Sequence, residues 1–353
     1  MPRLFQPLQQ RGLALRNRIA VSPMCQYSSV DGMPGDWHLV HLGSRAVGGA
    51  AVVFTEASAV SPEGRISPQD AGLWNDAQAQ AWSRIAHFID GLGAVPAMQL
   101  AHAGRKASTF APWRGTGEVP LGEGGWQTVA PSALRFDEDY PLPVALDAGG
   151  IAKVVADYRA AAMRAHEAGF RIVEIHAAHG YLLHEFLSPL SNRREDAYGG
   201  GFDGRTRLLR ETIAAVREVW PESLPLWLRI SATDWVDGGW DIAQSVEVSR
   251  IAASLGVDLV DVSSGGLDPR QEISVGPGYQ VPFAARIRRE AGVATGAVGM
   301  ITEPAQADAI VAQGEADMVL LAREFLRDPY FPRRAARALG VEPQPPEQYL
   351  RAW

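Results

Sequence analysis

Two histidines and a tyrosine stand close together in the run His176-Ala-Ala-His179-Gly-Tyr181. Neighbouring imidazoles can donate hydrogen bonds to one substrate oxygen, and a tyrosine two residues further on can give up a proton. The two histidines could instead satisfy loop backbone groups or bind zinc, although no H-E-x-x-H pattern or suitably spaced carboxylate accompanies them. The cluster predicts a site that binds and protonates a substrate, with a structural pair and a metal site as alternatives.

Two arginines occupy positions where a positive charge needs a partner. Arg229 lies within an apolar run, so its guanidinium requires an anionic or strongly accepting group, either a ligand or an ion-pair partner. Arg323 follows the last apolar run, and an earlier Ser-Ser-Gly-Gly turn ends with Gly265 and Gly266. Because glycine turns leave backbone N–H groups open to oxygens, these features predict a phosphate site.

The single cysteine, Cys25, follows Pro23 and Met24 at the end of the first apolar run. A lone cysteine is commonly an inert buried thiol, but this position also allows a functional role. With one cysteine the chain can form no internal disulfide, no cysteine-rich zinc module and no cysteine-ligated iron–sulfur cluster. His38 and His41 fall on an expected helix after this run, and we expect them to be structural.

Eight short apolar, β-prone runs alternate with longer helical patterns along the chain. The runs cover 19–22, 51–55, 95–100, 172–176, 226–231, 259–263, 294–298 and 318–321. Most are continuously apolar, as expected of parallel strands that are covered on both faces. The helical patterns cover 77–91, 151–168, 205–220, 242–255 and 304–313. Eight such β/α units predict an α/β fold, a single closed (β/α)8 TIM barrel over 1–353.

The length beyond a minimal barrel is expected in an N-terminal hairpin, two excursions and a tail. The excursions, 103–147 and 177–204, follow the third and fourth strands, so both should lie over the C-terminal face of the barrel, where catalytic sites form. The tail, 342–353, contains three prolines and cannot be a long helix. We expect it to be extended and to contact a neighbouring subunit.

Composition and charge exclude several classes of protein. Hydrophobic residues make up 46% of the 353 residues and charged residues 21%, a globular rather than a disordered balance. A formal net charge of −7 argues against a non-specific nucleic-acid binder, which would need a basic face. No apolar run approaches the ~18 residues of a membrane span, and no secretion signal is visible. These features predict a cytoplasmic protein that does not bind membranes.

Taken together, the motifs resemble those of the old yellow enzyme family of FMN-dependent ene-reductases, in particular its xenobiotic reductase and thermophilic-like subclass. The resemblance covers essentially the whole chain and is specific because the motifs occur jointly and in order. They are SPMCQY (22–27), DWHLVHL (36–42), EASAVSPEGRI (56–66), QLAHAGRKAS (99–108), HAAHGYLLHEFLSPLSNRREDAYGG (176–200), RISATDW (229–235), DVSSGG (261–266), LLAREFLRDPY (320–330) and QYLRAW (348–353).

The resemblance implies a single FMN-binding barrel. The residues implied to line the flavin ring or its pyrimidine side are Ser22, Pro23, Met24, Cys25, Ala57, Gln99 and Arg229, and those implied to hold the phosphate are Gly265, Gly266, Gly299 and Arg323. Arg229 would sit at the N1–C2=O edge, where a buried cation stabilises the negative charge of reduced flavin and raises its reduction potential. In this subclass the cysteine tunes the flavin.

The same resemblance implies that NADPH or NADH reduces the flavin, which then reduces the C=C bond of an activated alkene such as an enone. His176 and His179 would bind the carbonyl oxygen, and Tyr181 would protonate the α-carbon. Tyr27 and Lys106 would line the substrate side. Arg351 would reach the active site of a neighbouring subunit in a homodimer or homotetramer.

Two segments of the chain depart from the family pattern. The segment 201–205 differs from the family after its YGG motif, and bulky residues in 111–140 leave the substrate preference open. Two other functions stay open on the residues alone: a metal-dependent barrel lyase or hydrolase that uses His176 and His179, and a barrel that binds flavin or phosphate without turnover.

Overall fold

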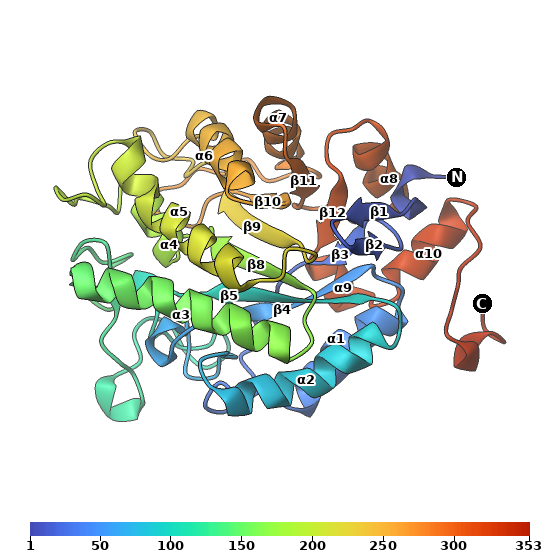
Figure 1. The fold of residues 1–353 in the computed structure, drawn as a ribbon, viewed down its shortest axis with the longest axis horizontal. Helices are drawn as coiled ribbons and strands as arrows, with labels where there is room; N and C mark the ends of the chain where they lie inside the picture. Colours follow the sequence, from blue (N-terminus) through green and yellow to red (C-terminus); the bar gives the residue numbers. More distant parts are fainter.

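Eight parallel strands close into a barrel in the computed structural model, which describes residues 1–353 (Figure 1). Around the barrel the order is β3 (Ile19–Val21), β4 (Val52–Ala59), β5 (Val95–Ala101), β8 (Ile172–Ala177), β9 (Leu226–Ser231), β10 (Leu259–Ser263), β11 (Ala294–Ala297) and β12 (Met318–Leu321). The last strand pairs with the first through Leu320 and Ala20. The predicted (β/α)8 barrel is therefore confirmed, and each of the eight apolar runs forms one of its strands.

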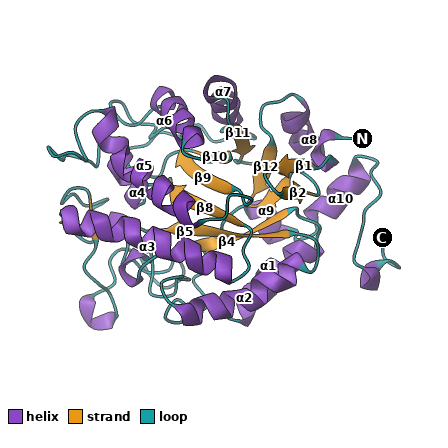
Figure 2. Ribbon diagram, in the orientation of Figure 1, coloured by secondary structure: helices purple, strands orange, loops and turns teal.

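Helices cover the outside of this barrel (Figure 2). They are α1 (Asp36–Val47), α2 (Asp76–Asp90), α3 (Ala148–Glu167), α5 (Phe202–Val219), α6 (Ile242–Ser254), α7 (Val281–Ala291), α8 (Pro304–Ala312) and α10 (Phe331–Ala338), with the short α4 (Leu182–Leu187) and α9 (Arg323–Arg327). Asn75 begins α2 by accepting the backbone N–H of Gln78 at 2.9 Å. The five predicted helices occur within three residues of their expected ends.

The helix α7 has no counterpart among those predictions. It follows Gly276-Pro277-Gly278 and carries Pro282 in its first turn, both of which look like loop signals in the sequence. Proline is tolerated there because the first N–H groups of a helix have no partner within the helix. The helix packs on β10 and β11 and completes the β/α cadence at that point.

The predicted N-terminal hairpin is present and closes one end of the barrel. It consists of β1 (Leu8–Gln10) and β2 (Leu13–Leu15). Leu13 and Leu15 join an apolar cluster inside the barrel, and Gln10 accepts a hydrogen bond from Nε1 of Trp227 at 2.7 Å. Because this end is sealed by apolar side chains, a ligand can enter only at the opposite end, where the strands end in polar residues.

The excursions and the tail lie at opposite ends of the molecule (Figure 1). The excursion after β5 contains the short parallel pair β6 (Val129–Ala130) and β7 (Val144–Ala145), and the excursion after β8 contains α4. The tail folds back on its own chain: Trp353 stacks on Tyr330 with ring centroids 6.4 Å apart, and the guanidinium of Arg337 lies 4.9 Å from the Trp353 ring.

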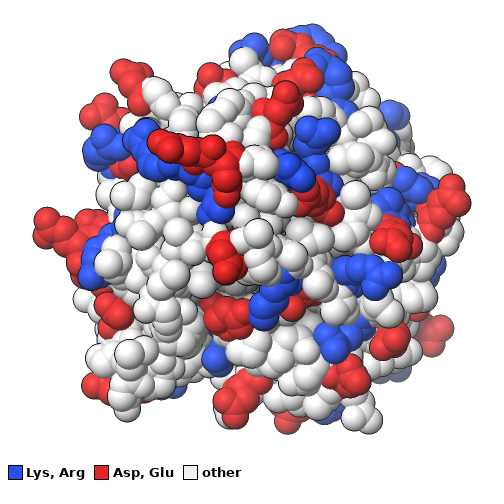
Figure 3. All heavy atoms as spheres, turned by 60° about the vertical axis from the view of Figure 1, so that its left-hand side comes forward, with Lys and Arg blue, Asp and Glu red and all other residues white.

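The surface carries both signs of charge. Figure 3 shows acidic and basic side chains intermingled on one face. Many form exposed ion pairs, such as Arg84 with Asp36 at 3.2 Å, and pairs of this kind contribute little to stability. None of the helices combines the length and the apolar character that crossing a bilayer requires.

Candidate active site

The predicted histidine and tyrosine cluster is assembled at the open end of the barrel. His176 is buried near the end of β8, and its ring centroid lies 5.2 Å from that of His179 and 5.2 Å from that of Tyr181. Both neighbours meet it edge-on, with interplanar angles of 80° and 79°. Three groups that can donate hydrogen bonds or protons therefore face one small region.

The two imidazoles keep nitrogen atoms available for a ligand. Nδ1 of His176 is buried without a partner, and Nδ1 of His179 is also unused, because His179 contacts Oγ of Ser263 through its Nε2 at 2.8 Å. Burial, and next the positive charge of Arg229, lowers the pKa of both histidines well below the ordinary value. Each ring is therefore neutral near pH 7 and can donate one N–H to a substrate oxygen.

The hydroxyl of Tyr181 is protonated and free to act as a proton donor. Its hydroxyl makes no hydrogen bond within the chain, and burial raises the pKa of the phenol well above its ordinary value, with Cys25 and Tyr27 adding to the effect. The ammonium of Lys106 lies 5.2 Å from the Tyr181 ring centroid. This cation would stabilise the negative charge that develops on Tyr181 as its proton leaves.

Lys106 also fastens two loops of the site together. Its Nζ donates to the backbone oxygen of His179 and to that of Gly266, both at 2.9 Å, and it lies 4.4 Å from the Phe136 ring centroid. Burial lowers the pKa of Lys106 to about 8. Lys106 thus connects the catalytic loop after β8 to the loop after β10 and to the first excursion.

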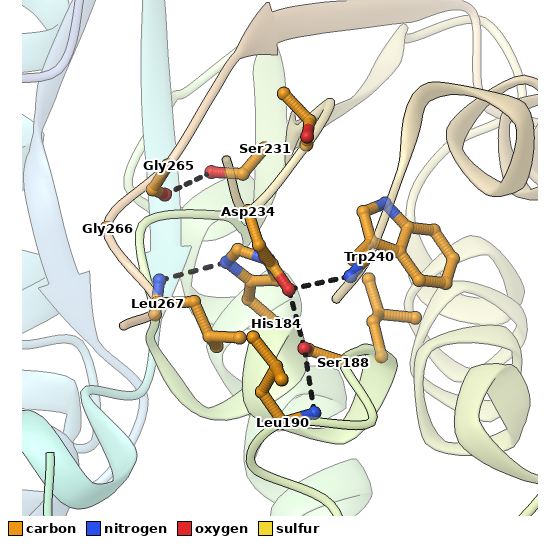
Figure 4. A network of polar contacts seen from close by, with 12 residues as sticks. His184, Ser188, Leu190, Ser231, Asp234, Trp240, Gly265, Gly266 and Leu267 are labelled. Carbon is orange, nitrogen blue, oxygen red and sulfur yellow. Dashed lines mark hydrogen bonds and ion pairs between the residues drawn. The ribbon is translucent and has the colours of Figure 1, made fainter. Parts of the chain in front are cut away.

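A buried network that the sequence did not predict lies beneath the Tyr181 loop (Figure 4). Asp234 accepts Nε2–H of His184 at 2.8 Å, the hydroxyl of Ser188 at 2.6 Å and the backbone N–H of Trp240 at 2.7 Å. Nδ1 of His184 in turn accepts the backbone N–H of Gly180 at 2.9 Å. The network links α4 and the loop after β9 to the residue that precedes Tyr181.

The floor of the site offers an unused donor and an unused acceptor. Nη1 of Arg229 donates to Oγ of Ser22 at 3.0 Å, but its Nη2 has no acceptor within the chain. Gln99 uses its Nε2 on Glu174 at 2.7 Å, and its Oε1 accepts nothing. Ala57 stands beside Gln99 in the β4–β5 register, next to a bulge. The pyrimidine ring of a flavin carries carbonyl acceptors and an N–H donor, so these side chains fit FMN.

The loop after β3 brings Cys25 to the same place. Burial raises the pKa of the Cys25 thiol well above its ordinary value. Pro23 precedes Met24, which packs against the large apolar core formed by the strands and the surrounding helices. His38 and Glu56 form a buried pair at 2.9 Å, and Glu56 accepts the backbone N–H of Gln26 at 3.0 Å, so the expected structural role of His38 includes holding this loop.

Tyr27 closes the substrate side together with the first excursion. It adopts a left-handed backbone conformation with φ +47°, and its ring meets that of Trp113 edge-on at 5.5 Å. Trp113 itself is 65% exposed. The 111–140 segment therefore contributes an aromatic side chain to the rim of the site, a contact between distant residues that the sequence analysis did not anticipate.

A separate cavity of about 270 Å³ lies where the phosphate is expected. Gly299 and Arg323 line it, together with Ser263 and Tyr279. The backbone N–H groups of Gly299 and Ala322 make no hydrogen bond within the chain, and Arg323 has no carboxylate partner. Free N–H donors and an unpaired cation are the groups that a phosphate requires.

Two predicted phosphate ligands lie elsewhere. The N–H of Gly265 donates to the Thr233 oxygen at 2.8 Å, and the N–H of Gly266 donates to Oε1 of Gln271 at 2.6 Å. Neither glycine lines the cavity of Gly299. Their turn instead packs against the catalytic loop, so the structure differs here from the expectation based on a glycine-rich turn alone.

Arg351 lies outside this site, and His176 and His179 are not part of a cluster arranged to bind a metal ion. Arg351 is exposed, and the C-terminal end of the chain lies on the other side of the molecule from the excursions (Figure 1). No group of three or more His, Cys, Asp or Glu side chains is arranged to hold a metal ion, so His176 and His179 lack a further ligand of these types.

Comparison with known proteins agrees with this geometry. The model of the NADH:flavin oxidoreductase / NADH oxidase family matches residues 3–342. An NADPH dehydrogenase of Listeria innocua is 48% identical over 100% of both chains, and one of Bacillus subtilis is 46% identical over 99% of both. Morphinone reductase superposes with a TM-score of 0.81 at 29% identity, covering 98% of this chain and 92% of that one. The old yellow enzyme homologue from Zymomonas mobilis gives a TM-score of 0.80 at 26% identity, covering 99% and 98%. The chain belongs to the NADH:flavin oxidoreductase family, the old yellow enzyme group that its motifs resemble.

Proposed function

We infer that this protein is an FMN-dependent, NAD(P)H-oxidising ene-reductase that acts on activated alkenes such as enones. The observation that carries this conclusion is the convergence of His176, His179 and Tyr181 at the barrel mouth, above a floor formed by Arg229 and Gln99. Bound FMN supplies the hydride, which it takes from NAD(P)H and passes to the alkene in alternation.

The side chains of the chain perform the remaining steps. His176 and His179 donate hydrogen bonds to the carbonyl oxygen of the alkene and stabilise the negative charge that develops there. Tyr181 delivers its proton to the α-carbon, and Lys106 lies 5.2 Å from the ring that loses it. Tyr27 and Trp113, whose rings meet edge-on, border the substrate at the rim of the site. Arg229, whose Nη2 has no acceptor within the chain, would donate to the pyrimidine edge of the cofactor.

Steady-state kinetics with a purified, FMN-loaded protein test this function. One site that serves NADPH and the alkene in turn predicts ping-pong kinetics and a product saturated at the C=C bond, with the carbonyl retained. Turnover of the carbonyl to an alcohol, or kinetics that require both substrates on the enzyme together, would contradict the assignment.

The tail is proposed to complete the site of a neighbouring subunit in a homodimer or homotetramer. In its own chain Arg351 is exposed, while Trp353 anchors the tail on Tyr330 and Arg337. An anchored tail with a free arginine suits a contact across subunits. Arg351→Ala should raise KM for the alkene without changing FMN binding, and a protein that is monomeric in sedimentation and fully active would rule the contact out.

A further inference from the structure

An arc of buried polar side chains lies inside the barrel beneath the proposed flavin site. It runs over four adjacent strands through Gln99, Glu174, Arg229 and Asp261. Gln99 and Glu174 are register partners across β5 and β8, and Arg229 and Asp261 are partners across β9 and β10. All four are at most 5% exposed.

This arc is sealed from below by apolar residues. Two positions before each member, and therefore on the same face of its strand, stand Ala97, Ile172, Trp227 and Leu259, all within the inner apolar cluster. Water therefore cannot reach the arc from the hairpin end. Whatever charge the arc carries must be balanced within it or by the ligand above it.

The arc holds two carboxyl groups but one cation. Nε of Arg229 lies 3.2 Å from Oδ2 of Asp261, while Oε2 of Glu174 and both oxygens of Asp261 lack a hydrogen bond. Burial raises the pKa of both carboxyl groups; the charge of Asp261 adds to the effect on Glu174, and Arg229 opposes it for both. Near neutral pH one carboxyl group keeps its proton while the other is ionised against Arg229.

No other charge in the barrel wall interferes with this balance. The ionisable side chains on the eight strands are Glu56, Glu174, His176, Arg229 and Asp261. Of these, Glu56 is engaged by His38 on α1, and His176 is neutral because burial lowers its pKa. Gln99, which belongs to the arc, and Ser22, which contacts it, carry no charge.

We propose that Glu174 and Asp261 are positioning residues that set the reduction potential of the bound flavin and take up a proton when it is reduced. Asp261 neutralises much of the positive charge that Arg229 would otherwise present to the flavin, so it lowers the potential. Glu174 holds the amide of Gln99 with its oxygen toward the cofactor. This inference rests on the proposed function, because it requires FMN above Arg229.

The proton uptake follows from charge balance. With FMN bound above Arg229, its reduction by NAD(P)H would add one negative charge near that guanidinium, and this charge would make the carboxyl pair a stronger base. A proton from solvent then binds to the Glu174–Asp261 pair, and it leaves again when the alkene takes the hydride. No other oxidant or reductant is needed.

Spectroelectrochemical titration of the FMN-loaded protein between about pH 5 and about pH 9 tests this proposal. Over part of this range, the midpoint potential of the wild type should fall more steeply with pH than protonation of the flavin alone predicts. The additional slope should correspond to one further proton for every two electrons. The absorption spectrum of the reduced cofactor reports protonation of the flavin itself. A pH dependence that flavin protonation explains completely would contradict the proposed proton uptake. This measurement needs no variant.

Asp261→Asn should raise the potential at mildly alkaline pH and remove the additional proton. Asp317→Asn is the matched control, because Asp317 also pairs with an arginine, Arg288 at 2.9 Å, but this pair is partly exposed to solvent. It should leave the potential unchanged. An unchanged or lower potential in a folded, FMN-loaded Asp261→Asn protein would refute the proposal. Failure of the wild type to bind FMN would instead refute the proposed function.

Discussion

Nδ1 of His184 accepts the backbone N–H of Gly180 at 2.9 Å, so a fully buried histidine holds the loop between His179 and Tyr181. Because Nδ1 is the acceptor, Nε2 carries the proton and donates it in a hydrogen bond to Asp234. Gly180 has a left-handed φ of +74°, and a Cβ there would lie 2.2 Å from the Gly266 oxygen. The buried pair therefore supports the loop from below, and the close approach to Gly266 leaves no room for a side chain at residue 180.

Asp234→Asn should misplace the catalytic loop. The carboxylate accepts three hydrogen bonds, so an amide group would turn one N–H toward another donor. Because small displacements of reacting groups are costly, we expect the catalytic efficiency for an enone to fall about tenfold or more. Asp203→Asn, at an exposed position on α5, is the control. Wild-type kinetics in the folded Asp234→Asn protein would show that the network does not position the loop.

Tyr181→Phe should separate the two half-reactions. Removing the hydroxyl leaves the floor and the two histidines in place, so reduction of the flavin by NADPH should change little. Reduction of an enone should slow by about 10²–10⁴-fold, the usual contribution of a positioned acid. Rapid-mixing kinetics of each half-reaction measure both rates. If the rates of both half-reactions fell equally, Tyr181 would not be the proton donor.

Cys25 should behave as a tuning residue rather than a nucleophile. Because burial raises the pKa of its thiol, the group stays protonated at neutral pH, and alkylation by iodoacetamide should be slow. Cys25→Ala should keep ene-reductase activity and shift the flavin potential. Complete inactivity in a folded, FMN-loaded Cys25→Ala protein would indicate a covalent role.

Lys106 should give the alkene reaction an alkaline limit. Burial lowers its pKa to about 8, so its positive charge is present below that pH and is lost as the pH rises through it. Loss of the charge makes Tyr181 a weaker acid, and enone reduction should decline above about pH 8. Lys106→Arg should move the decline to higher pH, and Lys106→Met should abolish it. The same inflection in Lys106→Met would assign it to another group.

The strands and the central cluster could be predicted because their signals are local in the sequence. Apolar runs define the barrel, and His176, His179 and Tyr181 lie within six residues of one another. The partners of this cluster could not be found in the same way. Asp234 lies 50 residues from His184, and Ser263 lies 84 residues from His179, so the closed barrel alone brings them together.

The glycine turn shows the limit of reading a motif without its surroundings. Gly265 and Gly266 resemble a phosphate-binding turn, but the side chain of Gln271 and the oxygen of Thr233 use their N–H groups. Nothing in the sequence near the turn indicates that these acceptors are available. The N–H of Gly299, in contrast, makes no hydrogen bond within the chain. Glycines at the ends of different strands therefore differ in whether their N–H groups are open to a phosphate.

An anaerobic absorption titration tests the central claim most directly. The purified protein should show the spectrum of bound flavin, lose its yellow colour when NADPH is added, and regain it when an enone is added without oxygen. A protein that carries no flavin, or a flavin that NADPH bleaches but no enone reoxidises, would contradict the assignment of this site as an ene-reductase.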